Sequence, residues 1–246
     1  MISPAWSKLS GREWSALRWA MKSSASLPFV KGAFAEYVVA DEKNVWLKPS
    51  AISFEHAAAL TIVSLTAWNA LVAKASLSAG QSVFITGCLG GVGRSAVQIA
   101  RMRGANVIGS CSASGREDAL ALGVGEVVDY RAFDIASYPR RFDVLFDTAG
   151  ALSLSQCGAM LKRRGMSLHI VPTFAKLIVS LLPSRHHLVF GNPTPKSLAG
   201  IAEAFARGQL APAIGRIAPL SEAISAVVEL ERTGFPKGKL VIAPMR

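Results

Sequence analysis

A glycine-rich segment after an apolar run carries the residue pattern with the clearest chemical use. The apolar residues 83–85 and Thr86 are followed by glycines at positions 87, 90, 91 and 93, in the spacing G-x-x-G-G-x-G. Glycine accepts positive φ angles and lets backbone N–H groups approach a ligand, and a helix that begins there adds about half a positive unit charge. The segment predicts a site for a diphosphate. The alternative is a tight strand-to-helix turn that binds nothing.

A second polar loop follows the next apolar run. Ser112, Ser114 and Arg116 lie close together in it, and no carboxylate stands between residue 106 and Glu117. In NAD-type folds an acid at this place receives the ribose hydroxyls, whereas arginine offers a forked set of donors to phosphate oxygens. These residues favour the 2′-phosphate of NADPH over NADH. The alternative is a solvated loop with an incidental arginine.

The elements that would position both loops alternate along the chain from residue 81 onward. Short apolar runs alternate with stretches whose apolar residues recur at helical spacing, which indicates βαβ units and a doubly wound parallel sheet. Beyond Pro172 the periodicity is lost for a dozen residues. The expected strands are residues 82–86, 106–110, 126–129, 143–147, 167–171 and 239–242. The expected helices are residues 92–103, 116–122, 152–161, 195–207 and 220–233.

The segment before the glycine-rich turn has a different pattern. Residues 33–40 alternate like a strand, and residues 54–72 are apolar at helical spacing. Two other features suit ordinary structural roles. His186 and His187 are expected in an exposed basic turn rather than at a metal, and Cys88 is expected to be a small packing residue because no general base stands near it in the sequence.

Composition narrows the class of protein. The chain has 246 residues, is 51% apolar and carries a net charge of +11, which favours anionic ligands. Its basic residues are scattered, so a dedicated nucleic-acid surface is not expected. The three cysteines stand far apart, which fits a reducing, cytoplasmic setting. The apolar runs are shorter than the roughly 20 residues of a membrane span. The first residues contain few acids, which leaves an organelle transit segment open.

Several stretches, taken in order, resemble the zinc-independent medium-chain dehydrogenase/reductases, in the branch of quinone oxidoreductases and enoyl reductases that includes zeta-crystallin. The resemblance runs from about residue 28 to the end of the chain. The matching stretches are GAFAEYVV at 32–39, AAAL at 57–60, TAWNAL at 66–71, the glycine-rich turn, VVDY at 127–130, DVLFDTAG at 143–150 and GKLVI at 238–242.

This resemblance implies a Rossmann-like domain that binds NADPH. The turn residues implied to contact it are Gly87, Gly90, Gly91, Val92 and Gly93. Ser112, Arg116 and Tyr130 would surround the adenosine phosphate, although Tyr130 could also be a packing residue. Thr66 would lie near the nicotinamide, or would equally be a buried helical threonine. No acid or base stands out as a proton donor, so no catalytic residue is nominated. No metal site is expected, because the histidines are not grouped with cysteines at ligand spacing.

The chain departs from the family's pattern at its start. Only 31 residues precede Gly32, where the family has a longer GroES-like domain. We therefore leave residues 1–27 unassigned and expect residues 28–71 to be a remnant of the GroES-like catalytic domain with a connecting helix. Residues 72–195 are expected to form the NADPH-binding domain. Residues 196–246 are expected to form C-terminal helices and a strand that pack on both parts.

The expected activity is hydride transfer from NADPH to a quinone or an activated C=C or carbonyl group, impaired by the short N-terminal part. The alternative is a nucleotide-binding remnant, or gene fragment, without turnover. The expected partner is a small-molecule substrate. The apolar residues 170–182 would serve a homodimer or would form a buried loop.

Overall fold

The computed structural model describes residues 23–25, 34–35, 45–48, 52–233 and 238–244. The chain divides into two compact units, residues 63–210 and residues 1–62 together with 211–246, and each is described by itself. Most of the segment 1–27 and of the strand expected at 33–40 lies outside the described residues. So do residues 234–237, which follow the helix expected at 220–233.

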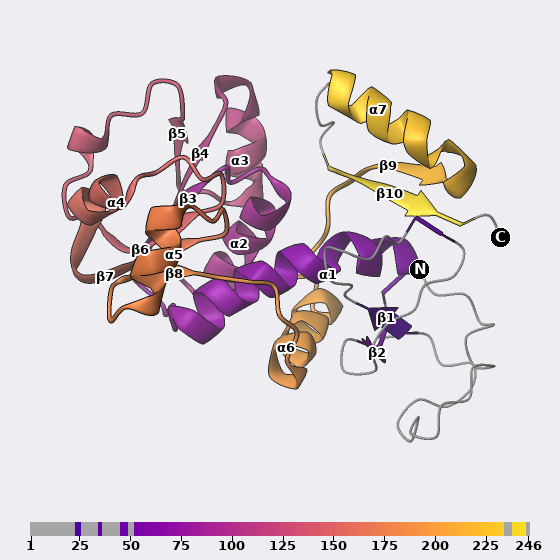
Figure 1. The fold of residues 1–246 in the computed structure, drawn as a ribbon, viewed down its shortest axis with the longest axis horizontal. Helices are drawn as coiled ribbons and strands as arrows, with labels where there is room; N and C mark the ends of the chain where they lie inside the picture. Colours follow the sequence, from indigo (N-terminus) through magenta and orange to yellow (C-terminus); the bar gives the residue numbers. More distant parts are fainter. Residues whose placement is uncertain (1–22, 26–33, 36–44, 49–51, 234–237, 245–246) are drawn as a thin grey trace. The chain divides into compact units, whose positions relative to one another are not determined.

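The larger unit is built on a six-stranded sheet whose strands all run parallel (Figure 1). The strand order is β5-β4-β3-β6-β7-β8, so the chain starts in the middle, winds to one edge, returns and winds to the other. This is the doubly wound order, and the predicted fold class is confirmed. The strands are β3 (Ser82–Thr86), β4 (Asn106–Cys111), β5 (Glu126–Asp129), β6 (Phe142–Asp147), β7 (Leu161–His169) and β8 (His186–Leu188).

Helices connect these strands and pack against them. Helix α2 contacts β3 and β4, α3 contacts β4 and β5, α4 contacts β7, and α5 contacts β8. Helix α3 ends at Gly123, whose φ of 98° closes it in the left-handed conformation that glycine permits. The helices are α1 (Phe54–Trp68), continued by a π-helical turn (Asn69–Lys74), α2 (Gly91–Met102), α3 (Arg116–Leu122), α4 (Leu154–Met160), α5 (Phe174–Leu181) and α6 (Pro195–Ala206).

The segment after Pro172 differs from the expectation of irregular chain. It forms α5 and β8, and the preceding strand β7 begins at Leu161 and ends at His169 instead of covering residues 167–171. The reason is visible in α5, which has eight residues, nearly all apolar, and whose one charged residue, Lys176, is buried. A helix of eight residues has only about two turns, which are too few for the spacing of its apolar residues to distinguish it from irregular chain.

The core of the sheet unit is aromatic on one side. The rings of Phe84, Phe133 and Phe142 pack together, with the Phe84 ring centroid 5.1 Å from that of Phe133 and 5.2 Å from that of Phe142. Tyr138 completes this cluster.

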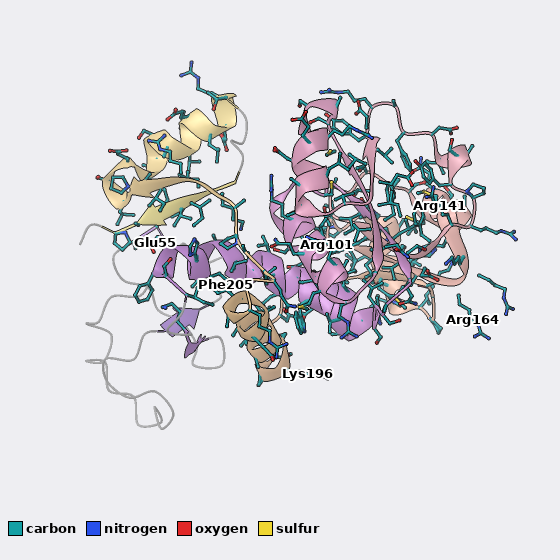
Figure 2. All side chains as sticks on the ribbon, turned by 180° about the vertical axis from the view of Figure 1, so that it is seen from behind. Glu55, Arg101, Arg141, Arg164, Lys196 and Phe205 are labelled. Atoms are coloured by element: carbon teal, nitrogen blue, oxygen red, sulfur yellow. The ribbon has the colours of Figure 1, made fainter. Side chains whose placement is uncertain are left out.

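Basic side chains lie on the surface of the same unit, where Figure 2 shows Arg141 and Arg164. The positive charges of this unit are thus exposed to solvent, whereas its core is apolar.

The smaller unit contains two short two-stranded sheets. Strand β1 (Ser23–Ala25) pairs antiparallel with β2 (Val45–Leu47). Strand β9 (Ile214–Pro219), which the sequence analysis did not predict, pairs in parallel with β10 (Lys239–Ala243). A 3₁₀ turn (Leu220–Glu222) and α7 (Ala223–Thr233) connect these two strands.

Helix α1 and its π-helical continuation form one apolar helix, Phe54–Lys74. It is 21 residues long, which is enough by length and composition to cross a membrane, and half of its most apolar window is buried. The apolar runs of the sequence did not predict such a segment, because polar residues keep each run shorter than the roughly 20 residues of a membrane span. One helix of this kind is weak evidence for a membrane span, since the core helix of a soluble protein meets the same criteria.

Candidate functional site

The glycine-rich turn joins the central strand β3 to the start of α2. Gly87 directly follows β3 with a φ of 60°, and Gly90 caps α2, its N–H donating to the Gly87 carbonyl at 2.9 Å. The N–H of Cys88 donates to the Ser110 carbonyl of β4 at 3.0 Å, which fixes the turn to the neighbouring strand. The first N–H groups of α2, from Gly91 to Gly93, have no preceding helical carbonyl. They are donors suited to an anionic group.

Gly93 is the position at which the turn and the helix approach most closely. A Cβ atom added there would lie 2.1 Å from the Gly87 carbonyl oxygen and 2.9 Å from the Cys88 Cα. Both neighbours are backbone atoms, which cannot rotate away as a side chain can. The turn keeps its shape only because residue 93 has no side chain.

The loop that contains Ser112, Ser114 and Arg116, here called the serine and arginine loop, lies next to this turn. A Cβ added at Gly115 would lie 2.6 Å from the Cδ1 of Leu89, so the two loops are in contact. The hydroxyl oxygens of Ser112 and Ser114 are 3.1 Å apart, and the Arg116 guanidinium donates from Nη1 to the Val127 carbonyl of β5 at 2.9 Å. The guanidinium is thereby held against the second residue of β5.

The remaining predicted ligand residues occupy different environments. Tyr130 follows β5, is 54% exposed, and donates its N–H to the Cys111 carbonyl at the end of β4. Thr66 is buried in α1. The structure thus brings the glycine-rich turn, Ser112, Arg116 and Tyr130 to the carboxyl edge of three adjacent strands, whereas Thr66 belongs to a helix. The ligand roles of all these residues stay predictions.

A buried polar cluster, which the sequence analysis did not identify, occupies the same edge of the sheet. Its centre is Asp147, the last residue of β6, whose side chain is fully buried. The Asp147 carboxylate accepts hydrogen bonds from Thr86 Oγ1 at 2.8 Å and from Lys176 Nζ at 3.0 Å, and lies 3.4 Å from His169 Nδ1. Thr86, Asp147 and His169 end the adjacent strands β3, β6 and β7.

The cluster continues from His169 to β8. Ser167 Oγ lies 2.8 Å from His169 Nε2 and 2.6 Å from His186 Nδ1. If the proton of His169 is on Nδ1, facing Asp147, then Ser167 donates to His169 and accepts from His186, and every bond is satisfied. The expectation of an exposed basic turn at His186 and His187 is wrong, because both residues are half-buried in β8.

Burial and hydrogen bonding shift the pKa values of two side chains at this edge of the sheet. Burial alone would raise the pKa of Asp147, but hydrogen bonds from His169, Lys176 and Thr86 hold it well below its usual value. The carboxylate is therefore ionised at neutral pH. Burial and the neighbouring Cys111 raise the pKa of Cys88 to about 12, so this thiol beside the turn is not a nucleophile.

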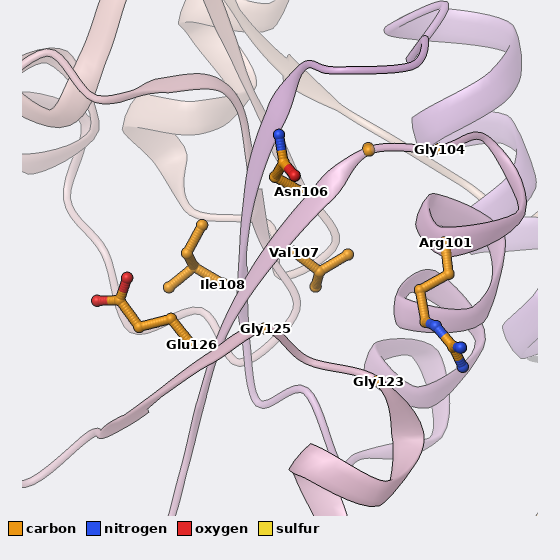
Figure 3. Close-up of a pocket in the computed structure, with 9 residues that line it drawn as sticks. Arg101, Gly104, Asn106, Val107, Ile108, Gly123, Gly125 and Glu126 are labelled. Atoms are coloured by element: carbon orange, nitrogen blue, oxygen red, sulfur yellow. The ribbon is translucent and has the colours of Figure 1, made fainter.

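A metal centre and a separate pocket are two other kinds of site that a chain of this type can contain. Within the described ranges, no three His, Cys, Asp or Glu side chains lie together in a way that could hold a metal ion. An open pocket of about 520 Å³ lies at the amino ends of β4 and β5, where Figure 3 shows Arg101, Asn106 and Glu126 among its lining residues. This pocket is at the sheet edge opposite to the glycine-rich turn, so it is separate from the candidate site.

Comparison with known proteins gives the following matches. The family described as zinc-binding dehydrogenase matches residues 91–192. A 2-methylene-furan-3-one reductase of Solanum lycopersicum is 38% identical over 121 residues, which are 48% of this chain and 31% of the reductase. The mitochondrial NAD(P)H oxidoreductase RTN4IP1 of Mus musculus is 28% identical over 87% of this chain and 62% of its own length.

Two further matches extend this result. A quinone oxidoreductase of Homo sapiens is 30% identical over 55% of this chain and 44% of its own length. The crystal structure of an alcohol dehydrogenase superfamily protein from Novosphingobium aromaticivorans superimposes with a TM-score of 0.76 at 25% identity, over 96% of this chain and 78% of that protein. The chain thus spans less than two thirds of each of the three relatives matched by sequence.

Proposed function

We propose that the chain is an NADPH-dependent oxidoreductase of the medium-chain dehydrogenase/reductase family, in the branch of the quinone oxidoreductases. The substrate would be a quinone or a compound with an activated C=C or carbonyl group. The observation that carries this proposal is the glycine-rich turn at the carboxyl edge of a doubly wound sheet, beside a serine and arginine loop. The names of the tomato, mouse and human relatives support it.

The chain's own residues suit the nucleotide in two ways. The N–H groups from Gly91 to Gly93 would donate to the diphosphate, and the positive end of α2 would stabilise its charge. Arg116, held at Val127, would donate to the 2′-phosphate together with Ser112. The bound nicotinamide supplies the hydride, while the protein supplies position and electrostatics. We propose no metal for this site.

Nucleotide titration tests the proposal directly. Calorimetry with NADPH and NADH should show tighter binding of NADPH, and Arg116→Glu should erase or reverse that preference, since a carboxylate repels the 2′-phosphate and accepts bonds from ribose hydroxyls. Arg164→Glu is a matched control, because it changes the same charge at an exposed position of β7 that is not part of the proposed nucleotide site. Equal affinities of the unchanged protein for both nucleotides would remove the assignment of the 2′-phosphate.

A second candidate function is nucleotide binding without turnover. NADPH consumption with simple quinones and enones separates the two candidates when the chain is compared with a version extended by any upstream coding sequence. Turnover by both versions at similar rates supports the enzyme, and turnover by the longer one alone supports the second candidate.

We further propose a homodimer and a location in a reducing compartment. Helix α5 exposes Phe174 and Leu181, each at 83%, so the alternative of a buried loop does not describe this segment. Exposed apolar side chains on one helix support an association of two copies. The relative from mouse is named as mitochondrial, which supports an organelle beside the cytoplasm. Analytical ultracentrifugation and cell fractionation test these two points.

A further inference from the structure

Lys176 and Asp147 form an ion pair that is almost completely buried. The two side chains are 5% and 0% exposed, and Lys176 Nζ lies 3.0 Å from Asp147 Oδ2. Removing two charges from water is costly, and apolar residues of similar size are often as stable in such a place. A buried pair therefore calls for a reason other than overall stability.

The Asp147 carboxylate holds the turn that follows β6. Its Oδ1 accepts from the N–H of Ala151 at 3.0 Å, and its Oδ2 accepts from the N–H of Leu152 at 3.3 Å. The same Oδ1 accepts from Thr86 Oγ1, and Thr86 Oγ1 accepts in turn from the N–H of Ala149 at 3.1 Å. One carboxylate thus links the end of β3 to the whole turn 148–152.

This turn borders the glycine-rich turn directly. A Cβ added at Gly87 would lie 3.4 Å from both the Cβ of Ala149 and the Oγ1 of Thr148. Thr86, which Asp147 binds, is the residue just before Gly87. The two turns meet between β3 and β6, where the winding of the sheet reverses, and ligands of doubly wound sheets bind at this point.

Lys176 is the only charged residue of α5, and it points inward while its neighbours are exposed. Leu177 and Ile178 are 48% and 45% exposed, whereas Lys176 contacts Asp147, 29 residues earlier in the chain. Without this ammonium group, a buried carboxylate would keep only neutral donors and the His169 ring. Its hold on Thr86 and on the turn 148–152 would weaken, because a buried ion without an opposite charge is strongly unfavourable.

We propose that Lys176 is a positioning residue for the nucleotide. Acting through Asp147, it keeps the turn 148–152 and the end of β3 in the arrangement that the glycine-rich turn needs, and it does not touch the ligand. This inference rests on the proposed function for its ligand, but its geometric content is independent of it. A residue in helix α5 thereby becomes part of the nucleotide site.

Four variants test the inference by NADPH calorimetry and thermal unfolding. Lys176→Met should raise the Kd for NADPH about tenfold, which is the effect of weakening about one charge-assisted hydrogen bond to phosphate. Lys176→Arg should keep the Kd close to that of the unchanged protein, because it restores a cation. Asp147→Asn combined with Lys176→Met should be more thermally stable than Lys176→Met alone, because it removes the unpaired buried charge. Its affinity for NADPH should stay as weak as that of Lys176→Met. Lys162→Met, which breaks the exposed pair with Asp143, is the control and should change neither.

Hydrogen exchange of the ligand-free proteins provides a second measurement. Lys176→Met should speed exchange of the N–H groups of Ala149, Ala151 and Leu152, and Lys162→Met should not. Two results would overturn the inference. One is a folded double variant whose Kd for NADPH equals that of the unchanged protein, and the other is a Lys176→Met protein in which these N–H groups exchange at the unchanged rate. If the unchanged protein binds neither NADPH nor NADH, the proposed function fails, and exchange alone decides whether Lys176 positions the turn.

Discussion

Replacing Gly93 by alanine is expected to weaken nucleotide binding more than about a hundredfold while the protein remains folded. The added Cβ would lie 2.1 Å from the Gly87 carbonyl oxygen, more than 1 Å closer than the roughly 3.5 Å of an ordinary contact. Both the oxygen and the neighbouring Cys88 Cα belong to the backbone, so the turn itself must move by about that difference. Such overpacking costs about 1–3 kcal/mol of stability.

The loss of affinity follows from the same displacement. A shift of about 1 Å moves N–H groups out of hydrogen-bonding distance of a diphosphate, and each bond to a charged group contributes about 1.5–3 kcal/mol. Losing two of them corresponds to about 3–6 kcal/mol, which raises the Kd more than about a hundredfold. Calorimetry with NADPH measures the affinity, and thermal unfolding measures the stability.

The control for this substitution is Gly125→Ala. Gly125 is exposed and precedes β5 at the opposite edge of the sheet, and its added Cβ would lie 3.4 Å from the Val107 carbonyl oxygen, an ordinary contact. This variant should bind NADPH as the unchanged protein does. If Gly93→Ala also binds NADPH with unchanged affinity while it remains folded, the diphosphate lies elsewhere and the reasoning is refuted.

Two predictions concern titratable groups. The pKa of Asp147 is lowered in the folded protein, so its contribution to the free energy of unfolding is present above the usual value of 3.8 and is lost as the pH falls below it. Urea unfolding between pH 5 and 3 should show a shallower loss of stability in the Asp147→Asn/Lys176→Met protein, and an equal loss would contradict this. The three cysteine thiols are buried, and burial raises the pKa of Cys88 to about 12 and that of Cys157 to about 11. A thiol reagent such as DTNB at pH 8 should therefore react fast with none of the three until urea unfolds the protein, and one fast-reacting thiol would show that a cysteine is accessible.

Local sequence patterns predicted much of the sheet unit. The strands at 82–86 and 126–129 and the helix at 116–122 have the predicted bounds, because each is a short periodic run that ends at a polar or glycine residue. Helix α5 was not predicted. Its burial of Lys176 depends on Asp147, 29 residues away in the sequence, and no pattern within eight residues contains that information.

The candidate site was predicted in part. The glycine-rich turn and Arg116 could be found because their chemistry is local to a few residues. The Asp147 cluster was missed, although a signal for part of it exists: Thr86 and Asp147 are polar residues at the ends of apolar strands. His169 gave no such signal, because it lies in the middle of the strand expected at 167–171. The carboxyl ends of adjacent parallel strands meet at one edge of a sheet, so polar residues in those places should be considered together.

The pairing of β3 with β6 also has a consequence for the order in which the chain folds. Strands β3 and β4 are joined by 19 intervening residues, whereas Thr86 and Asp147 are 61 positions apart. Contacts between distant segments form late because closing a long loop costs entropy. The strands β3, β4 and β5 can assemble first, and the junction with β6 then completes the site. We therefore expect NADPH to slow unfolding more than it speeds refolding, since the site does not yet exist in early intermediates.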